Sequence, residues 1–415
     1  MRANKWVAGV VLSGLCLCQP ALTTAQTANT EAPGIVMPGP ATQKAVQPVA
    51  QPQPVAKPGP KPATPGANLA AAKTVRLTLL LPLDSDSLGR AADAVRSGFL
   101  AAYDLESNGL SLNIVSTTDV AEEIVSSYTN ALADSDIVIG PLTRSAATAI
   151  AQSGAVRLPT ISLTQSDADS DSSTMPPQML AMGLSVEDEA REVAGWIASN
   201  KVKKAYALYT SSAWQRRAAK AFAAKARSLG LAVETVELGS SYGFLSALDV
   251  DRLKKELQAE KNLANYAVFA ALDAGQTKQL REAIGNEPAI YGTAQINPVP
   301  LPDRATFERL PELNGVRLLD IPWQLQPDHA AVMIYPRAVV DADQKRSADM
   351  ERLYALGIDA FRVALLAARQ QKQFEIDGVT GRLKASFDKD GAHFTRIEPF
   401  AIYREGLPAF LSEGH

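Results

Sequence analysis

Polar side chains that could bind a ligand follow several of the apolar segments in this sequence. Asp84, Ser85 and Ser87 come directly after the apolar run Val75–Leu81. Hydroxyl groups, together with the free N–H groups at helix N-termini, can bind a carboxylate or a sugar. The same residue types also cap helices, so each one has a purely structural alternative. The candidate ligand residues are Asp84, Ser85, Ser87, Thr143, Ser162, Thr164, Ser211, Trp214 and Trp323.

Catalysis and metal binding receive no comparable support. None of the histidines His329, His393 and His415 is followed three or four positions later by a metal-ligating residue. The stretch 140–144 (GPLTR) lacks the Gly-x4-Gly-Lys pattern of a phosphate loop. We therefore expect no catalytic set, no metal site and no cofactor.

Alternating strand-like and helix-like segments position the candidate residues. Val75–Leu81 is typical of a strand buried on both faces, and the apolar spacing over 91–103 predicts the helix that follows it. Repetition of this unit predicts an α/β fold with parallel sheets and right-handed crossovers. The strands are too many for one compact half, so we expect two doubly wound, Rossmann-like lobes joined by a hinge. Trp323 lies at a predicted crossing, where it would wedge the hinge or line the cleft.

The tail of the chain predicts a hairpin. Residues 381–387 and 394–403 alternate apolar and polar side chains around a turn at Asp388–Gly391. The expected organisation is a signal peptide (1–25), a disordered linker rich in Pro, Ala and Gln (26–73), and a folded part (74–410). Within it we expect lobe 1 at about 74–184 and 320–378, and lobe 2 at about 185–319 and 379–410.

The N-terminus predicts export. Arg2 and Lys5 precede a short apolar segment, and Ala25 ends a small-residue cleavage site. The two cysteines of the chain, Cys16 and Cys18, lie in this leader, so cleavage at Ala25 would remove them both. The alternative is a lipoprotein attached through Cys16 or Cys18, although Leu stands before each where a small residue is preferred. The Pro-rich segment that follows is either a spacer or a passive terminus.

Composition excludes some function classes. The formal net charge is −3, without the basic bias of a nucleic-acid-binding protein. No apolar run after the leader is long enough to span a membrane. The sequence therefore predicts an exported protein, placed in the periplasm.

The order of elements resembles the type I periplasmic binding proteins, and within that fold the penicillin-binding protein activator family (LppC or LpoA type). Four stretches carry the resemblance: LLLPLDSDSLGRAADAVRSGFLAAY, SDIVIGPLTRSAATAIA, RLYALGIDAFRVALLAAR and DGVTGRLKASFDKDGAHFTRIEPFAIYREG. The resemblance implies a non-enzymatic regulator that binds and activates a class A penicillin-binding protein, a peptidoglycan synthase. It also implies anchoring to the outer membrane as a lipoprotein. The chain departs from the enteric pattern because a Pro-rich tether replaces the helical repeat domain and the lipid-attachment motif is degenerate.

A second interpretation of the same fold is a solute-binding receptor that delivers an amino acid or similar small ligand to an ABC transporter. The cleft loops would then bind the ligand directly. A third interpretation, an α/β-hydrolase-like enzyme, is disfavoured.

Overall fold

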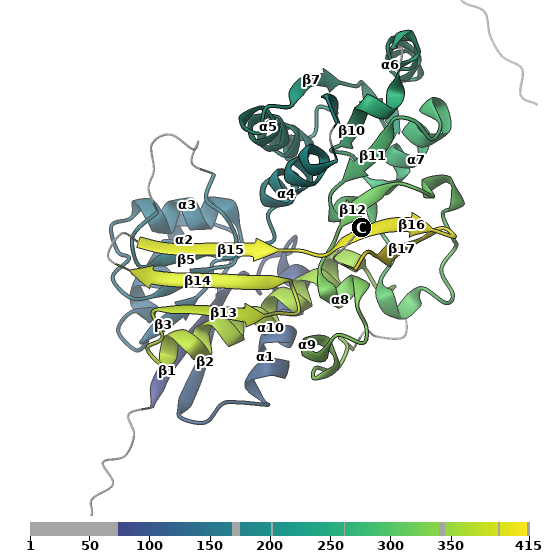
Figure 1. Cartoon of the computed structure of the whole chain (residues 1–415). Helices are drawn as coiled ribbons and strands as arrows, with labels where there is room; N and C mark the ends of the chain where they lie inside the picture. The colour runs from purple at the N-terminus through teal and green to yellow at the C-terminus, as the bar shows by residue number, and fades with distance from the viewer. Residues whose placement is uncertain are drawn as a thin grey trace, which may run out of the picture. The chain divides into compact units, whose positions relative to one another are not determined.

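The structure, a computed structural model, describes residues 74–167, 175–200, 202–260, 262–339, 345–388 and 391–412. All of these fall in one unit of the chain, Leu69–His415. The predicted signal peptide with Cys16 and Cys18, and the predicted linker, lie outside the described residues. Two larger sheets with flanking helices, and a smaller antiparallel sheet, make up the described fold (Figure 1).

The first sheet has five parallel strands in the order β2-β1-β3-β4-β5. Leu77 and Leu79 of β1 pack under α1 and α10, and Leu80 packs against α2 and α3, because side chains alternate across a strand. The sheet is therefore covered on both faces. Its elements are β1 (Val75–Leu81), α1 (Gly89–Tyr103), β2 (Leu110–Ser116), α2 (Ala121–Ala131), β3 (Ile137–Ile139), α3 (Arg144–Gln152), β4 (Thr160–Ser162), β5 (Met179–Ala181) and α10 (Ala348–Ala368).

The second sheet has the order β17-β16-β12-β11-β10-β6-β7; its strands are parallel except β16, which pairs antiparallel with both β12 and β17. Helices α4 and α5 cover one face, and α6 and α7 the other. Its elements are α4 (Val186–Ser199), β6 (Lys204–Tyr209), α5 (Ala213–Ser228), β7 (Ala232–Glu237), α6 (Ala247–Ala259), β10 (Tyr266–Ala270), α7 (Ala274–Ile284), β11 (Ala289–Gly292), β12 (Arg317–Leu319), β16 (Phe400–Arg404) and β17 (Leu407–Phe410). The expected α/β class with doubly wound sheets is confirmed.

The predicted C-terminal hairpin is present, but its second strand differs from the expectation. β14 (Arg382–Asp388) pairs with β15 (Gly391–Ile397), and β13 (Gln373–Asp377) completes this small sheet. The expected strand 394–403 is broken at Glu398-Pro399, and its second half is β16 of the second sheet. Proline has no N–H to donate to a ladder, which favours the break there. Leu383 and Ala385, in the segment assigned to lobe 2, pack in the same cluster as Leu77.

Sequence reasoning missed β2 and α2. Strand β2 is an edge strand with half its residues exposed, so LSLNIVS lacks the continuous apolar run that marks β1. Helix α2 buries Ile124, Tyr128 and Ala131 at helical spacing, but the segment is short and rich in Ser, Thr and β-branched residues. Both elements depend on packing against β1 and α3 rather than on a strong local pattern.

Helices α1 and α10 approach each other through glycine. A Cβ on Gly98 would lie 1.8 Å from the carbonyl oxygen of Tyr354, and a Cβ on Gly357 would lie 2.1 Å from that of Val95. Beside them, the rings of Phe99 and Phe361 meet edge to face at 5.4 Å. Two of the stretches that carry the family resemblance thus pack on each other with their backbones in contact.

Short elements connect these parts. None of the helices in the described ranges is both long and apolar enough to cross a membrane. The remaining elements are β8 (Ser240–Ser241), β9 (Phe244–Leu245), α8 (Pro322–Leu325), α9 (Ala330–Met333), and the 3-10 turns Leu263–Asn265, Ala294–Ile296, Leu301–Asp303 and Pro311–Leu313.

Candidate functional site

Most of the predicted ligand hydroxyls in the first sheet already bond to the backbone. The Ser85 hydroxyl accepts from the N–H of Leu88 at 3.2 Å and lies 3.3 Å from the hydroxyl of Ser87. Thr143 caps α3 by accepting from the N–H of Ala146 at 3.3 Å. The Thr143 contact is the helix cap that the structural alternative expects, whereas the Ser85 contact lies in the turn before α1.

The hydroxyls of Ser162, at the end of β4, and of Thr164 also bond to backbone groups. Ser162 is fully buried and donates to the carbonyl oxygen of Thr164 at 2.8 Å, and the Thr164 hydroxyl faces the carbonyl of Gln165 at 3.4 Å. Ser211 is exposed and Trp214 half-buried at the start of α5. Binding of a ligand by any of these residues stays a prediction.

Asp84 and Trp323 lie in different environments. Asp84 is exposed and lines a cavity of about 780 Å³ that also includes Arg337 and Glu351. Trp323 is fully buried: its indole N–H donates to Glu351 at 2.7 Å, and the guanidinium of Arg337 lies 3.9 Å from its ring centroid. Trp323 therefore packs in the core cluster of α1 and α10.

A polar cluster, which sequence reasoning missed, forms where the chain passes between the sheets. The passing segments are 182–185 before α4, 320–321 after β12, and 398–399 between β15 and β16. Asp320, fully buried, pairs with Arg352 of α10 at 2.7 Å. The same Arg352 donates to the carbonyl oxygens of Ala294 and Asn297, each at 2.9 Å. One guanidinium thus joins α10 to two segments of the second sheet.

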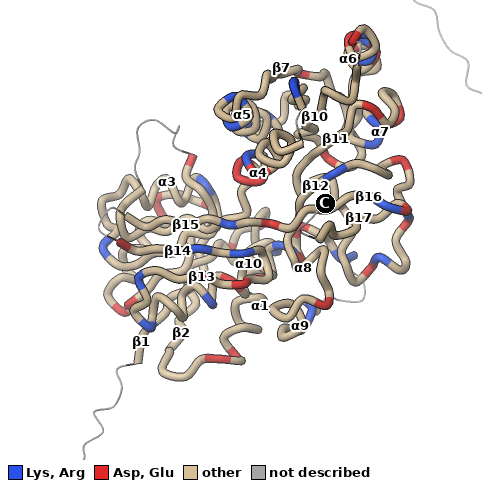
Figure 2. Tube along the Cα trace, in the orientation of Figure 1, with Lys and Arg blue, Asp and Glu red and all other residues tan. Residues whose placement is uncertain are grey.

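A second arginine, in β15, connects that strand to the segment before α4. Arg396 of β15 donates to the carbonyl oxygens of Gly183 at 2.7 Å and Met182 at 2.8 Å, and to the hydroxyl of Thr380 at 3.2 Å. Figure 2 shows charged residues of both signs at the end of β15 and on α4. Arg396 therefore holds β15 against the start of α4.

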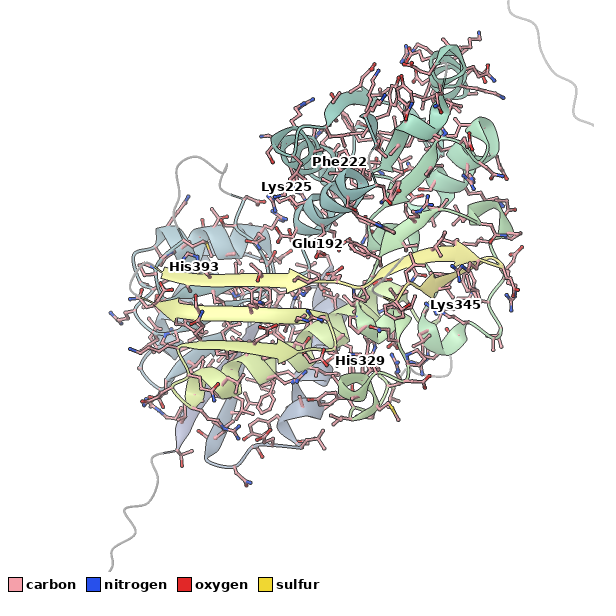
Figure 3. The ribbon with its side chains drawn as sticks, viewed as in Figure 1. Glu192, Phe222, Lys225, His329, Lys345 and His393 are labelled. Atoms are coloured by element: carbon pink, nitrogen blue, oxygen red, sulfur yellow. The ribbon has the colours of Figure 1, made fainter. Side chains whose placement is uncertain are left out.

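Three glutamates complete the cluster. Glu189 accepts from the N–H of Ala294 at 2.8 Å, and Glu192 accepts from the N–H of Glu398 at 3.3 Å. Figure 3 places Glu192 on α4, close to the line of β15 and β16. Burial raises the pKa of Glu189 to about 8 and that of Glu192 to about 7, and it raises the pKa of Glu398 well above its usual value.

An ion-pair bridge lies near this cluster. Glu187, in the first turn of α4, accepts from Arg144 of α3 at 2.8 Å and from Arg217 of α5 at 2.8 Å. The three side chains are partly exposed, so the bridge contributes modestly to stability. Its geometry connects a helix of the first sheet with two helices of the second.

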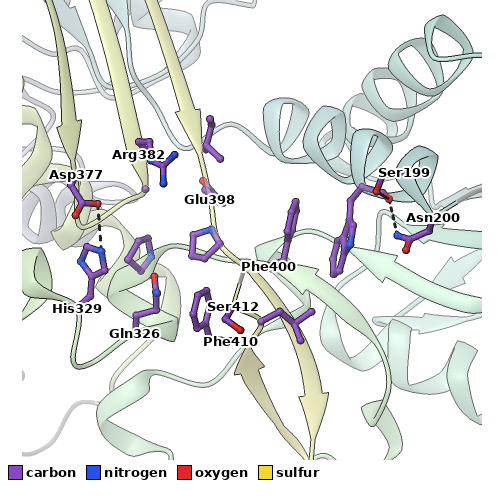
Figure 4. Close-up of a pocket in the computed structure, with 16 residues that line it drawn as sticks. Ser199, Asn200, Gln326, His329, Asp377, Arg382, Glu398, Phe400, Phe410 and Ser412 are labelled. Atoms are coloured by element: carbon purple, nitrogen blue, oxygen red, sulfur yellow. Dashed lines mark hydrogen bonds and ion pairs between the residues drawn. The ribbon is translucent and has the colours of Figure 1, made fainter. Parts of the chain in front are cut away.

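A cavity of about 480 Å³ opens beside the same passing segments (Figure 4). Trp196 and Phe400 stack on one side of it with ring centroids 4.3 Å apart. On the other side His329 lies 3.4 Å from Asp377. Its size suits a small ligand, and its walls mix aromatic and polar groups. Of the histidines considered as metal ligands, His329 lines this cavity, whereas His393 lies at the far end of β15 (Figure 3).

The aromatic and polar groups that line this cavity can bind a small ligand. Within the described residues, no group of three or more His, Cys, Asp or Glu side chains is arranged to hold a metal ion. Among the described residues that line this cavity, no Ser or Thr hydroxyl forms a hydrogen bond with the histidine side chain. The polar cluster between the sheets has one signal in the sequence: Asp320, Arg396 and Glu398 are charged residues next to apolar strands.

Comparison with known proteins gives the family. A family model described as "LppC putative lipoprotein" matches residues 42–390. The chain belongs to the LppC family. A relative named penicillin-binding protein activator LpoA, from Yersinia pseudotuberculosis, is 25% identical over 435 aligned residues, covering 85% of the LppC-family chain. Another of that name, from Haemophilus ducreyi, is 30% identical over 210 residues and covers 49% of the chain.

Solved structures support the fold of this LppC-family chain. Full-length LpoA from Haemophilus influenzae superposes with a TM-score of 0.63 at 19% identity, covering 83% of the chain. A "putative branched-chain amino acid ABC transporter" from Chromobacterium violaceum superposes with a TM-score of 0.62 at 31% identity, covering 79% of the chain and all of that structure. The chain spans 64% of the Yersinia relative, 33% of the Haemophilus ducreyi relative and 60% of full-length LpoA.

Proposed function

We propose that this chain is a non-enzymatic regulator of peptidoglycan synthesis that binds and activates a class A penicillin-binding protein in the cell envelope. The observation that carries the proposal is membership of the LppC family, with relatives named penicillin-binding protein activator over 85% of the chain. Activation would follow from binding the active conformation of the synthase more tightly than the inactive one. No enzyme chemistry is needed for this role.

We also propose that the protein acts in the periplasm. The family description names a lipoprotein, and the leader carries Cys16 and Cys18 as attachment candidates, with cleavage after Ala25 as the alternative. Either form would place the folded part outside the cytoplasmic membrane, where a peptidoglycan synthase works. There, the two expected lobes would together contact the partner.

Stimulation of a purified synthase tests the proposed function. We expect the mature chain to raise the rate of glycan polymerisation or crosslinking by at least one class A penicillin-binding protein of the same organism. The control is a type I periplasmic binding protein added at the same concentration, which should leave the rate unchanged. If the chain stimulates none of the organism's class A synthases, the proposal is wrong.

A solute receptor is the second candidate, because the Chromobacterium violaceum structure is 31% identical to this chain. We nevertheless expect no tight binding of free amino acids. Ser162 and Thr143 already bond to the backbone, and leaving those partners would cost part of the binding energy. Calorimetry against the common amino acids measures this. A dissociation constant of about 1 μM or less, roughly −8 kcal/mol, would favour the receptor.

A further inference from the structure

Three glutamates meet in a small cavity between α4 and β15. The cavity has a volume of about 190 Å³, and Glu189, Glu192 and Glu398 contribute to its walls together with Arg396. α4 lies on the side of the second sheet, whereas β15 belongs to the small sheet packed on the first. A change of charge in this cavity therefore acts on the segments that connect the two sheets.

Glu398 is the least satisfied member of the cluster. Its side chain is 5% exposed, and its Oε2 atom has no hydrogen-bond partner within the described residues. A buried charged carboxylate without a partner is far more costly than a buried neutral carboxyl group. The position of Glu398, directly before Pro399, fixes the carboxyl in the link between β15 and β16.

The nearby cations do not compensate the three glutamates. Arg396 directs its donors to the carbonyls of Gly183 and Met182 and to Thr380. Arg352 pairs with Asp320 and with Asp349. The charged groups that line the cavity are Asp188, Glu189, Glu192, Arg396 and Glu398. Asp320 and Arg352 act on Glu189 from beyond the cavity, and Glu398 also lines the larger cavity with His329, Asp377 and Arg382. Four acidic groups thus line the small cavity with one arginine.

We propose that Glu189, Glu192 and Glu398 form a proton-operated latch on the segments that join the two sheets. While the carboxyls are protonated, α4 and β15 pack together. When the carboxyls ionise, mutual repulsion and the demand for water loosen residues 182–192 and 394–400, and the sheets gain freedom to move. The latch is independent of the identity of any partner or ligand.

The sign of the effect follows from the direction of the pKa shifts. Burial raises the pKa of Glu189 to about 8 and of Glu192 to about 7, whereas an unfolded glutamate titrates at 4.5. The latched state therefore holds more protons than the open state between pH 4.5 and about 8. Its stability is fully present below pH 4.5, falls as the pH rises, and is lost above about pH 8. Each released proton makes opening up to tenfold more favourable per pH unit.

Hydrogen exchange of the full chain tests the latch. Between pH 6 and 8, after correction for the intrinsic exchange rate, we expect the opening constant of residues 182–192 and 394–400 to rise at least tenfold. Amides of α2, remote from the cluster, serve as the internal reference. In Glu398→Gln, which keeps the shape and removes one titrating group, the rise should be clearly smaller. Glu256→Gln, which replaces an exposed glutamate on α6, is the matched control and should behave as the wild type.

Two results would overturn the proposal. One is a flat opening constant for residues 182–192 and 394–400 in the wild type across this pH range, which needs no variant. The other is an equal rise in the wild type, Glu398→Gln and Glu192→Gln. If Glu398→Gln does not fold, Glu192→Gln replaces it, because Glu192 lies on α4 rather than in the link between β15 and β16.

Discussion

Replacing Gly357 by alanine should destabilise the folded part by about 3 kcal/mol or more. The added methyl group would lie 2.1 Å from the carbonyl oxygen of Val95 and 2.8 Å from the amide nitrogen of Phe99. Both are backbone atoms, so α1 and α10 would have to move apart and lose the packing between them. Insertion of extra groups into a packed core usually costs about 1–3 kcal/mol, and a backbone clash belongs at or beyond the upper end. Urea denaturation followed by circular dichroism measures the free energy of unfolding.

Gly195→Ala is the matched control for this experiment. Gly195 also lies inside a helix, α4, but a Cβ there would meet nothing within 4 Å. Alanine has the higher helix propensity, so we expect a gain of about 0.5–1 kcal/mol. Equal effects of the two substitutions would show that the contact between α1 and α10 is looser than the structure describes.

The second large effect is expected for Arg352→Met. The change removes the cationic partner of the fully buried Asp320, which keeps only the neutral donors of Asn297 and Ile321. It also takes one donor from the carbonyl oxygens of Ala294 and Asn297. Removing one member of a buried ion pair costs about 3–5 kcal/mol because the other charge stays buried and unpaired. The free energy of unfolding should fall by this amount in denaturant titrations at pH 7.

A surface arginine provides the control. Arg191 pairs with Asp188 one turn away on α4, and both side chains are about half exposed. Arg191→Met should change the free energy of unfolding by less than about 0.5 kcal/mol. A further check is the double variant Arg352→Met with Asp320→Asn, which removes the stranded charge and should recover part of the loss. No recovery would mean that the hydrogen bonds of Arg352, rather than its charge, hold the segments.

Local patterns were sufficient for the parts of the fold that are buried on both faces. The strand Val75–Leu81 and the helix after it were expected at nearly the observed bounds, because a continuous apolar run and a 3.6-residue stripe are both visible in the sequence. Ser185 is the N-cap of α4, and its hydroxyl accepts from the N–H of Asp188 at 3.2 Å, as its residue type and position before the helix favour. The pattern failed for β2, which is half exposed at the edge of its sheet.

The candidate ligand residues stay a prediction. Sequence reasoning selected hydroxyls after strands, and the structure shows that Ser85, Thr143 and Ser162 bond to nearby backbone groups. A cap and a ligand contact use the same residue types in the same places, so the sequence does not separate them. The cavity beside His329 and Asp377 was missed because its walls come from segments far apart in the chain.

By itself, the sequence determined the α/β class, the doubly wound sheets and the resemblance to the activator family, since these depend on residues close together in the chain. Tertiary structure alone decided where the buried charges meet. Arg396 lies 213 residues from Gly183, and Glu189 lies 105 residues from Ala294. No local period or spacing encodes such a contact, because each charged residue is tolerated only after folding has brought its distant partner or its proton to it.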